Sequence, residues 1–81
     1  MGLTKIKIQK AFKDNNLGEV EVNQIPTTKG DATLYATKDK HYIVVVSSIT
    51  CRLIYKRKEV ISCNVKDIDK IVNKINTVTS L

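Results

Sequence analysis

The hydrophobic pattern is densest in the middle of the chain, between residues 41 and 63. Within it, Tyr42–Val46 is an uninterrupted run of one aromatic and four β-branched residues, which fits a pleated strand better than a helix. Side chains alternate across a strand, and here both alternating sets are apolar. The run therefore predicts a central strand whose two faces both need cover.

The same region continues as a predicted hairpin. Residues 49–55 and 59–63 have strand composition, and they flank the basic segment Lys56-Arg57-Lys58, which is typical of a short polar loop. With a three-residue loop, the predicted cross-strand pairs are Tyr55 with Glu59, Leu53 with Ile61, and Cys51 with Cys63. This register places the two cysteines at the same level on one face of the sheet.

The first segment, residues 4–16, is compatible with two structures. As a helix it would begin with Thr4 as N-cap and end at the stop signal Asn15-Asn16-Leu17-Gly18. Its apolar face would consist of Ile8, Ala11 and Phe12. As a strand, Lys5–Ile8 would alternate lysine with isoleucine, the pattern of a half-buried edge strand. We favour the helix, because the alternation is short and the stop signal fits a helix better.

A second hairpin is predicted before the central run. Residues 19–25 alternate glutamate with valine at first and form a short strand, which ends before Pro26 because proline cannot donate to a ladder. Pro26–Asp31 has the composition of a mobile loop. Ala32–Thr37 is then predicted to be a strand, and Lys38-Asp39-Lys40 turns the chain into the central run.

From Asn64 onward the apolar spacing changes to three and four residues, which is the period of a helix. The apolar stripe consists of Val65, Ile68, Ile71, Val72, Ile75 and Val78. Asn64 is the predicted N-cap, and Asp67 and Asp69 lie where the helix dipole favours negative charge. This helix is expected to depend on packing against the sheet, because its many β-branched residues lower its intrinsic propensity.

Together these elements predict an α+β fold. It consists of an antiparallel meander of about four to five strands, with a C-terminal amphipathic helix on one face and an N-terminal helix. The second face of the sheet would be covered either by the N-terminal helix or by another copy of the chain, which makes a homodimer possible.

Composition limits the possible partners. The chain has 81 residues, enough for a single domain with a thin core, and 14 Lys and Arg against 8 Asp and Glu give a net charge of +6. A positive surplus favours nucleic acid, an anionic membrane surface or an acidic protein as partner. No segment approaches the ~20 apolar residues that span a bilayer, and no secretion signal is evident. The sequence therefore predicts a soluble, intracellular, cytoplasmic protein that does not bind membranes.

The residues that could carry catalysis or bind a metal are few. Cys51 and Cys63 are too few and too far apart for structural zinc, and His41 is the only histidine. The two cysteines could form a cross-strand disulfide or remain as two reduced thiols in the core. No glycine-rich nucleotide loop and no nucleophile with a matching base can be recognised. We therefore expect a protein that is not an enzyme, with no cofactor and no small-molecule substrate.

The basic residues carry the strongest functional signal. They cluster in the first thirteen residues and around the loop of the central hairpin. The predicted nucleic-acid-binding residues are Lys5, Lys7, Lys10, Arg52, Lys56, Arg57 and Lys58. A projecting hairpin with a basic loop suits the phosphate backbone of duplex DNA, whereas the four aromatic residues are expected in the core rather than as platforms for single strands. The alternative is a protein-interaction or self-assembling module of a virus or mobile element that docks a host factor.

Overall fold

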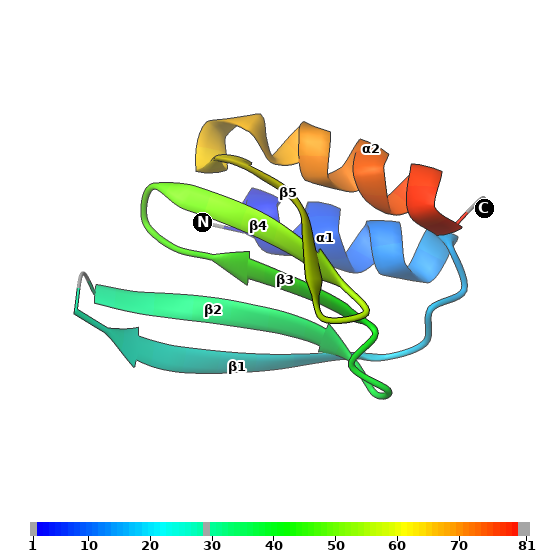
Figure 1. Cartoon of the computed structure of the whole chain (residues 1–81), viewed down its shortest axis with the longest axis horizontal. Coiled ribbons are helices and arrows are strands. Elements are labelled where there is room, and N and C mark those ends of the chain that lie inside the picture. The colour runs from blue at the N-terminus through cyan, green and yellow to red at the C-terminus, as the bar shows by residue number, and fades with distance from the viewer. Residues whose placement is uncertain (1, 29, 80–81) are drawn as a thin grey trace.

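The computed structural model describes residues 2–28 and 30–79. In chain order the elements are α1 (Gly2–Asp14), β1 (Val20–Thr27), β2 (Gly30–Thr37), β3 (Tyr42–Val46), β4 (Thr50–Tyr55), β5 (Lys58–Asn64), the 3-10 turn η1 (Val65–Asp67) and α2 (Ile68–Thr79). Over these described residues, five strands form one antiparallel sheet in the order β1-β2-β3-β4-β5 (Figure 1). The predicted α+β meander with a helix at each end is confirmed.

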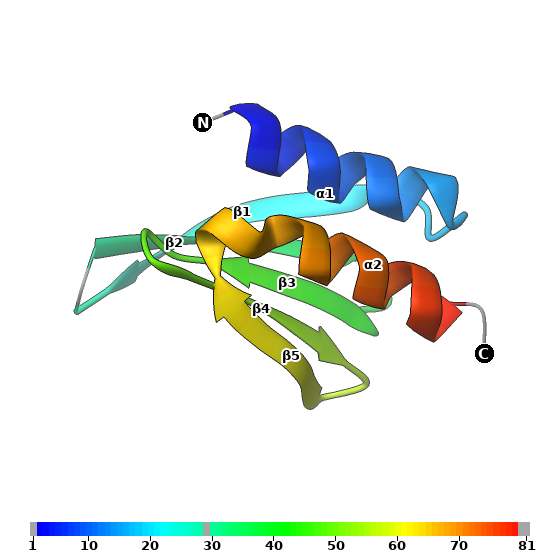
Figure 2. The same ribbon diagram turned by 90° about the horizontal axis from the view of Figure 1, so that it is seen from above.

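Both helices lie side by side on the same face of the sheet (Figure 1 and Figure 2). α2 packs along β4 and β5, and α1 packs beside α2. The core fills the space between the helices and this covered face. Its buried residues are Ile8, Ala11, Phe12, Tyr35, Val44, Cys51, Leu53, Ile68, Ile71 and Ile75. The idea that the N-terminal helix covers the second face is wrong, because its apolar residues enter the same core as those of α2.

The N-terminal segment is a helix, and the alternative strand over Lys5–Ile8 is wrong. Ile8 and Phe12 are four residues apart, so they share one face of the helix, and both are 0% exposed. Ile6 projects from another side and is 59% exposed. Residues four apart enter the same core only when the segment is helical. The burial of both residues therefore outweighs the short alternation of lysine and isoleucine that suggested a strand.

The ends of α1 are only partly as predicted. The helix begins at Gly2, so Thr4 is not its N-cap. The Thr4 signal was weak, because no Glu or Gln follows three residues later to complete a capping box. The helix ends at Asp14, directly before the predicted stop signal at residues 15–18, where Asn16 and Gly18 adopt positive φ values of 56° and 87°. Left-handed residues of this kind commonly terminate helices.

β1 and β2 are longer than predicted and pair down to Thr27 and Gly30. The predicted loop over Pro26–Asp31 is wrong, since Pro26 pairs with Asp31 inside the sheet. Proline is tolerated there because β1 is an edge strand, so the missing N–H removes no bond to a neighbouring strand. The hydroxyl of Thr27 donates a hydrogen bond to the carbonyl of Gly30 and helps close this end of the hairpin.

The β4–β5 turn is one residue shorter than predicted. Tyr55 pairs with Lys58 and Ile54 pairs with Glu59, so the predicted pairing of Tyr55 with Glu59 is wrong. A β-bulge then leaves Val60 without a residue opposite it and shifts the register by one. This shift restores the other two predicted pairs, which are Leu53 with Ile61 and Cys51 with Cys63.

The C-terminal helix follows the prediction closely. The side-chain oxygen of Asn64 accepts a hydrogen bond from the backbone N–H of Lys66 at 3.0 Å, as expected of an N-cap. The first three residues after the cap form η1 rather than α-helix. Ile68, Ile71 and Ile75 are buried in the core, and the three valines of the stripe are half-buried.

The second face of the sheet carries no helix, and we call it the open face. Its central strands present mainly half-buried apolar side chains, whereas its edge strands present mainly polar ones, with the exposed Ile25 of β1 as an exception. The apolar members in the middle are Leu34, Ile43, Val45 and Ile54. The polar members at the edges are Glu21 and Asn23 on β1, and Glu59 and Ser62 on β5.

Candidate nucleic-acid interface

Two basic turns lie at the same end of the sheet. In an antiparallel meander, every second turn falls at the same end, so the β2–β3 turn and the β4–β5 turn are neighbours (Figure 1). The backbone N–H of Lys56 donates a hydrogen bond to the carbonyl oxygen of His41 at 2.9 Å and joins the two turns directly. We call the basic residues of these turns the basic end. They are Lys38, Lys40, Lys56, Arg57 and Lys58.

The β2–β3 turn is held in shape by the buried residue Thr37. The hydroxyl of Thr37 donates to the carboxylate of Asp39 at 2.7 Å, and the same carboxylate oxygen accepts the backbone N–H of His41 at 3.0 Å. The backbone N–H of Lys40 donates to the carbonyl of Thr37 at 2.9 Å. These hydrogen bonds to the carboxylate, with that from Thr37 first, lower the pKa of Asp39. Asp39 therefore organises the turn that presents Lys38 and Lys40.

The β4–β5 turn has an unusual backbone for its residues. Its two central residues, Lys56 and Arg57, have φ values of 50° and 70°, the φ pattern of a type I′ turn. This turn normally contains Asn-Gly or Asp-Gly, because other side chains are strained at positive φ. Lys40 in the neighbouring turn also has a positive φ, of 61°. Three basic residues of this end thus occupy backbone positions where glycine or asparagine would be more stable.

The charges of the basic end are available to a ligand. All five side chains are exposed, and within the described part of the chain no ion pair involves any of them. The ammonium group of Lys56 lies 5.2 Å from the centre of the Tyr55 ring, a cation–π contact that holds it at the turn without cancelling its charge. Asp39, between Lys38 and Lys40, contacts the turn and His41, and Glu59, next to Lys58, contacts the side chain of Arg52.

The structure separates the other predicted residues from this end. Lys5 and Lys10 are exposed on α1, and α2 lies between α1 and β5, so these lysines belong to a different surface (Figure 2). Lys7 forms an ion pair with Asp69 of α2 at 3.0 Å. Arg52 lies on the open face, with its Nε 3.8 Å from a carboxylate oxygen of Glu59. The predicted set is therefore not one continuous surface.

Two residues of the basic end, Lys38 and Lys40, were missed by the sequence reasoning. The sequence does contain the information needed to include them, since Lys38-Asp39-Lys40 is predicted to be a turn. Counting alternate turns of the predicted meander would have placed this turn beside Lys56-Arg57-Lys58. Clustering of charges along the chain identifies only one of the two turns, because the other is brought beside it by the strand order.

The aromatic residues offer few stacking surfaces. Phe12 and Tyr35 are buried, with exposures of 0% and 5%. Tyr42 and Tyr55 are half-buried, and their ring centres lie 4.8 Å apart, so they pack on each other across β3 and β4. The prediction that the aromatic side chains belong mainly to the core is confirmed.

The two cysteines are reduced and lie opposite each other near the other end of the β4–β5 hairpin. Their Sγ atoms are 3.4 Å apart. His41 is exposed, with Nδ1 3.4 Å from a carboxylate oxygen of Asp39. Over the described residues, no group of three or more His, Cys, Asp or Glu side chains is arranged to hold a metal ion.

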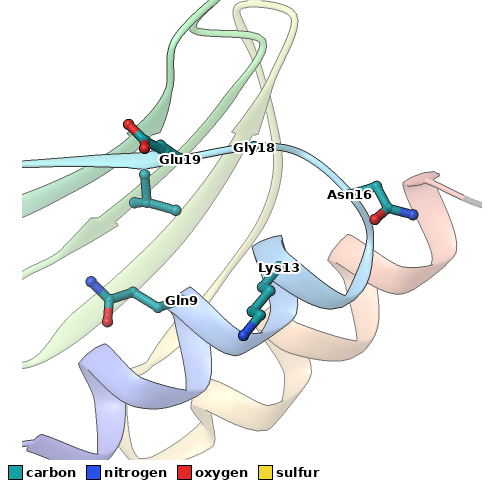
Figure 3. Close-up of a pocket in the computed structure, with 6 residues that line it drawn as sticks. Gln9, Lys13, Asn16, Gly18 and Glu19 are labelled. Atoms are coloured by element: carbon teal, nitrogen blue, oxygen red, sulfur yellow. The ribbon is translucent and has the colours of Figure 1, made fainter.

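A hollow lies between the second half of α1 and the start of β1 (Figure 3). It is lined by Gln9, Lys13, Asn16, Gly18, Glu19 and Val20. In the close-up, the labelled polar side chains point in different directions, and the carboxylate of Glu19 points away from the helix. This divergence gives the hollow no convergent set of polar groups that could bind and polarise a small molecule.

The chain matches no family of known proteins, no curated protein and no solved structure. Among the described helices, none combines the length and the hydrophobicity needed to cross a bilayer.

Proposed function

We propose that this chain binds nucleic acid, and specifically the phosphate backbone of duplex DNA, through the basic end. The observation that carries the proposal is the meeting of two basic turns, with five exposed cationic side chains that no carboxylate pairs within the described residues. Cations that contact phosphates release condensed counterions, which is the main source of affinity for DNA without sequence preference. In this proposal the chain is a cytoplasmic binding protein without enzymatic activity.

The backbone of the two turns supports a functional reason for these side chains. A left-handed conformation costs an ordinary residue about 1–2 kcal/mol, and Lys40, Lys56 and Arg57 all adopt it. Strain of this kind concentrates at sites where a side chain is needed for function. A basic side chain placed in a tight turn is also held close to a rigid backbone, so less conformational entropy is lost when it binds a phosphate.

Duplex binding is favoured over single-strand binding by the same geometry. Proteins that bind single strands combine a basic groove with exposed aromatic side chains on which bases stack. Here all four aromatic residues are buried or half-buried. The two turns are separated by about two strand spacings, roughly 10 Å, which is comparable to the ~12 Å width of the major groove. They could therefore contact phosphates on both sides of a groove.

A salt titration of binding to a duplex of random sequence tests the proposal. If five cations contact phosphates, the slope of log affinity against log salt is about −4.5, and affinity falls about 500-fold between 50 and 200 mM salt. Changing Lys38, Lys40, Lys56, Arg57 and Lys58 to Gln should remove most of this slope.

A matched control carries the same loss of charge on the helices. Changing Lys10, Lys13, Lys66, Lys70 and Lys74 to Gln lowers the net charge equally but leaves the basic end intact. This control should retain most of the slope, because steering by net charge alone acts weakly at physiological salt. Equal losses in the two variants would show that DNA responds only to net charge, and an unchanged slope in the first variant would refute the proposed surface.

Self-association through the open face is the second candidate function, and one observation favours it. The open face has an apolar centre and a mainly polar margin, the arrangement of an interface between proteins. The occupant we propose is a second copy. Arg52 and Glu59 place both signs of charge on this face, so it can complement itself in a two-fold dimer. The molecule's longer extents of 35 and 25 Å also allow a contact near the ~800 Å² per partner of stable complexes.

Light scattering during size-exclusion chromatography, at rising protein concentration, tests the dimer. Val45→Glu, in the centre of the open face, should give a monomer, whereas Ile6→Glu on the exposed side of α1 should leave the dimer intact. A wild-type chain that remains monomeric at the highest concentration would rule this candidate out.

A further inference from the structure

We propose that Cys51 and Cys63 form a dithiol–disulfide site, which reacts with low-molecular-weight disulfides and closes into a cross-strand bond that staples the fold. The two residues are register partners in β4 and β5, and their Sγ atoms are 3.4 Å apart. Directly opposed residues of an antiparallel pair have Cα atoms about 4.5–5.5 Å apart, which lies within the range that disulfides require. No strand has to move far for the bond to form.

The surroundings of the pair exclude metal binding and leave thiol chemistry. No third ligand joins the two sulfurs within the described chain. Their remaining polar contacts are with backbone carbonyls, from Cys51 Sγ to the oxygen of Asn64 at 3.6 Å and from Cys63 Sγ to the oxygen of Asp67 at 3.5 Å. Two thiols without further ligands, held in contact, have oxidation to a disulfide as their available chemistry.

The two thiols differ in access, and this difference sets the order of the reaction. Cys51 is 0% exposed, whereas Cys63 is half-buried. Burial, together with the neighbouring Cys63, raises the pKa of the Cys51 thiol to about 12, so it stays protonated at neutral pH. Cys63 is therefore the residue that an external disulfide reaches first, and Cys51 is the residue that completes the bond.

The reaction proceeds in two balanced exchanges. The Cys63 thiolate attacks one sulfur of glutathione disulfide, which breaks the S–S bond of the oxidant, forms a mixed disulfide on Cys63 and releases one glutathione thiolate. Cys51 then loses its proton to solvent, and its thiolate attacks Cys63 Sγ and releases the second glutathione. Overall, two protein thiols are oxidised to a disulfide while one glutathione disulfide is reduced to two thiols.

The bond would link the C-terminal end of β5 to the core strand β4, just before η1 and α2 begin. A domain of this size has a thin core. A covalent link between residues distant in the sequence lowers the conformational entropy of the unfolded chain and so stabilises the folded state. Oxidation should raise Tm by roughly 10–20 °C. The pair lies at the opposite end of the hairpin from the basic end, so oxidation should leave the salt slope of DNA binding unchanged. The inference is thus independent of the proposed function.

The test exposes the full chain to glutathione buffers of increasing oxidised fraction, followed by alkylation and mass spectrometry. Wild type should form the internal disulfide with the expected rise in Tm. Cys51→Ala should stop at the mixed disulfide on Cys63, and Cys63→Ser should form almost no adduct because Cys51 is buried. Equal adducts in both variants, or a wild-type disulfide without a rise in Tm, would overturn the proposal.

A kinetic measurement keeps the test decisive should a variant fold poorly. In wild type, the second exchange depends on the small fraction of Cys51 thiolate, which rises about tenfold per pH unit below the pKa of about 12. Conversion of the mixed disulfide to the internal disulfide should therefore accelerate about tenfold per pH unit. A rate independent of pH, or no internal disulfide at full oxidation, would contradict the assigned order.

Discussion

The strained β4–β5 turn allows stability and binding to be separated by two pairs of substitutions. Lys56→Asn with Arg57→Gly supplies the residues that a type I′ turn prefers. Positive φ costs about 1–2 kcal/mol at each original residue. Part of this gain is offset. The substitutions remove the Lys56–Tyr55 cation–π contact, which contributes about 0.5–1 kcal/mol, and glycine increases the conformational entropy of the unfolded chain, which costs a similar free energy. The net stabilisation should be about 1 kcal/mol, which raises Tm by about 4–8 °C.

The matched pair, Lys56→Gln with Arg57→Gln, removes the same two charges and keeps the backbone strain. Thermal unfolding followed by circular dichroism should show the Asn–Gly pair as more stable than wild type, and the Gln pair as no more stable than wild type. Both pairs should reduce the salt slope of DNA binding by about 1.8, because each removes two cations. The reasoning about strain is refuted if the two pairs have the same Tm, and the reasoning about phosphate contact is refuted if the slope does not change.

Three further predictions concern the core and two titrating groups. The free energy of unfolding should fall as pH rises from 9.0 toward about 12, because over that range the Cys51 thiol ionises only in the unfolded chain. Urea unfolding in the presence of reductant should show this fall, and the Cys51→Ala variant should lack this component. Ile75→Ala should destabilise by about 2–5 kcal/mol in urea unfolding, whereas exposed Thr77→Ala should stay within about 0.5 kcal/mol of wild type. The Asp39 carboxyl should titrate below pH 3.8 by NMR, and Thr37→Val should move its pKa back toward that value; an unchanged pKa would contradict the assigned hydrogen bond.

The fold was largely predictable because the apolar pattern changes clearly along the chain. The uninterrupted aromatic and β-branched run at Tyr42–Val46 identifies a strand, the period of three to four after Asn64 identifies a helix, and the structure confirms both. The predicted pairing of Cys51 with Cys63 was correct only because two errors in the predicted hairpin compensate each other. The turn is one residue shorter than assumed, and the bulge at Val60 adds one residue back, so the two errors cancel. A bulge leaves no clear trace in a hydrophobic pattern.

The placement of α1 and the composition of the candidate site were less predictable. A periodic stripe shows which side of a helix is apolar, but it does not say which face of the sheet that side will cover. The choice depends on packing between distant segments, such as the contacts of Ile8 and Phe12 with a core that α2 also enters. Likewise, Lys38 and Lys56 lie far apart in the chain and become neighbours only through the strand order.

The most direct test of the basic end is an NMR titration of the labelled chain with a short duplex of random sequence at low salt. We expect the largest chemical-shift changes at the backbone amides of residues 38–41 and 55–59. These changes should disappear when the salt concentration is raised. Amides of α1 and α2, including those of Lys10 and Lys70, should change little. The largest shifts on the helices, or no shifts at low salt, would contradict the account.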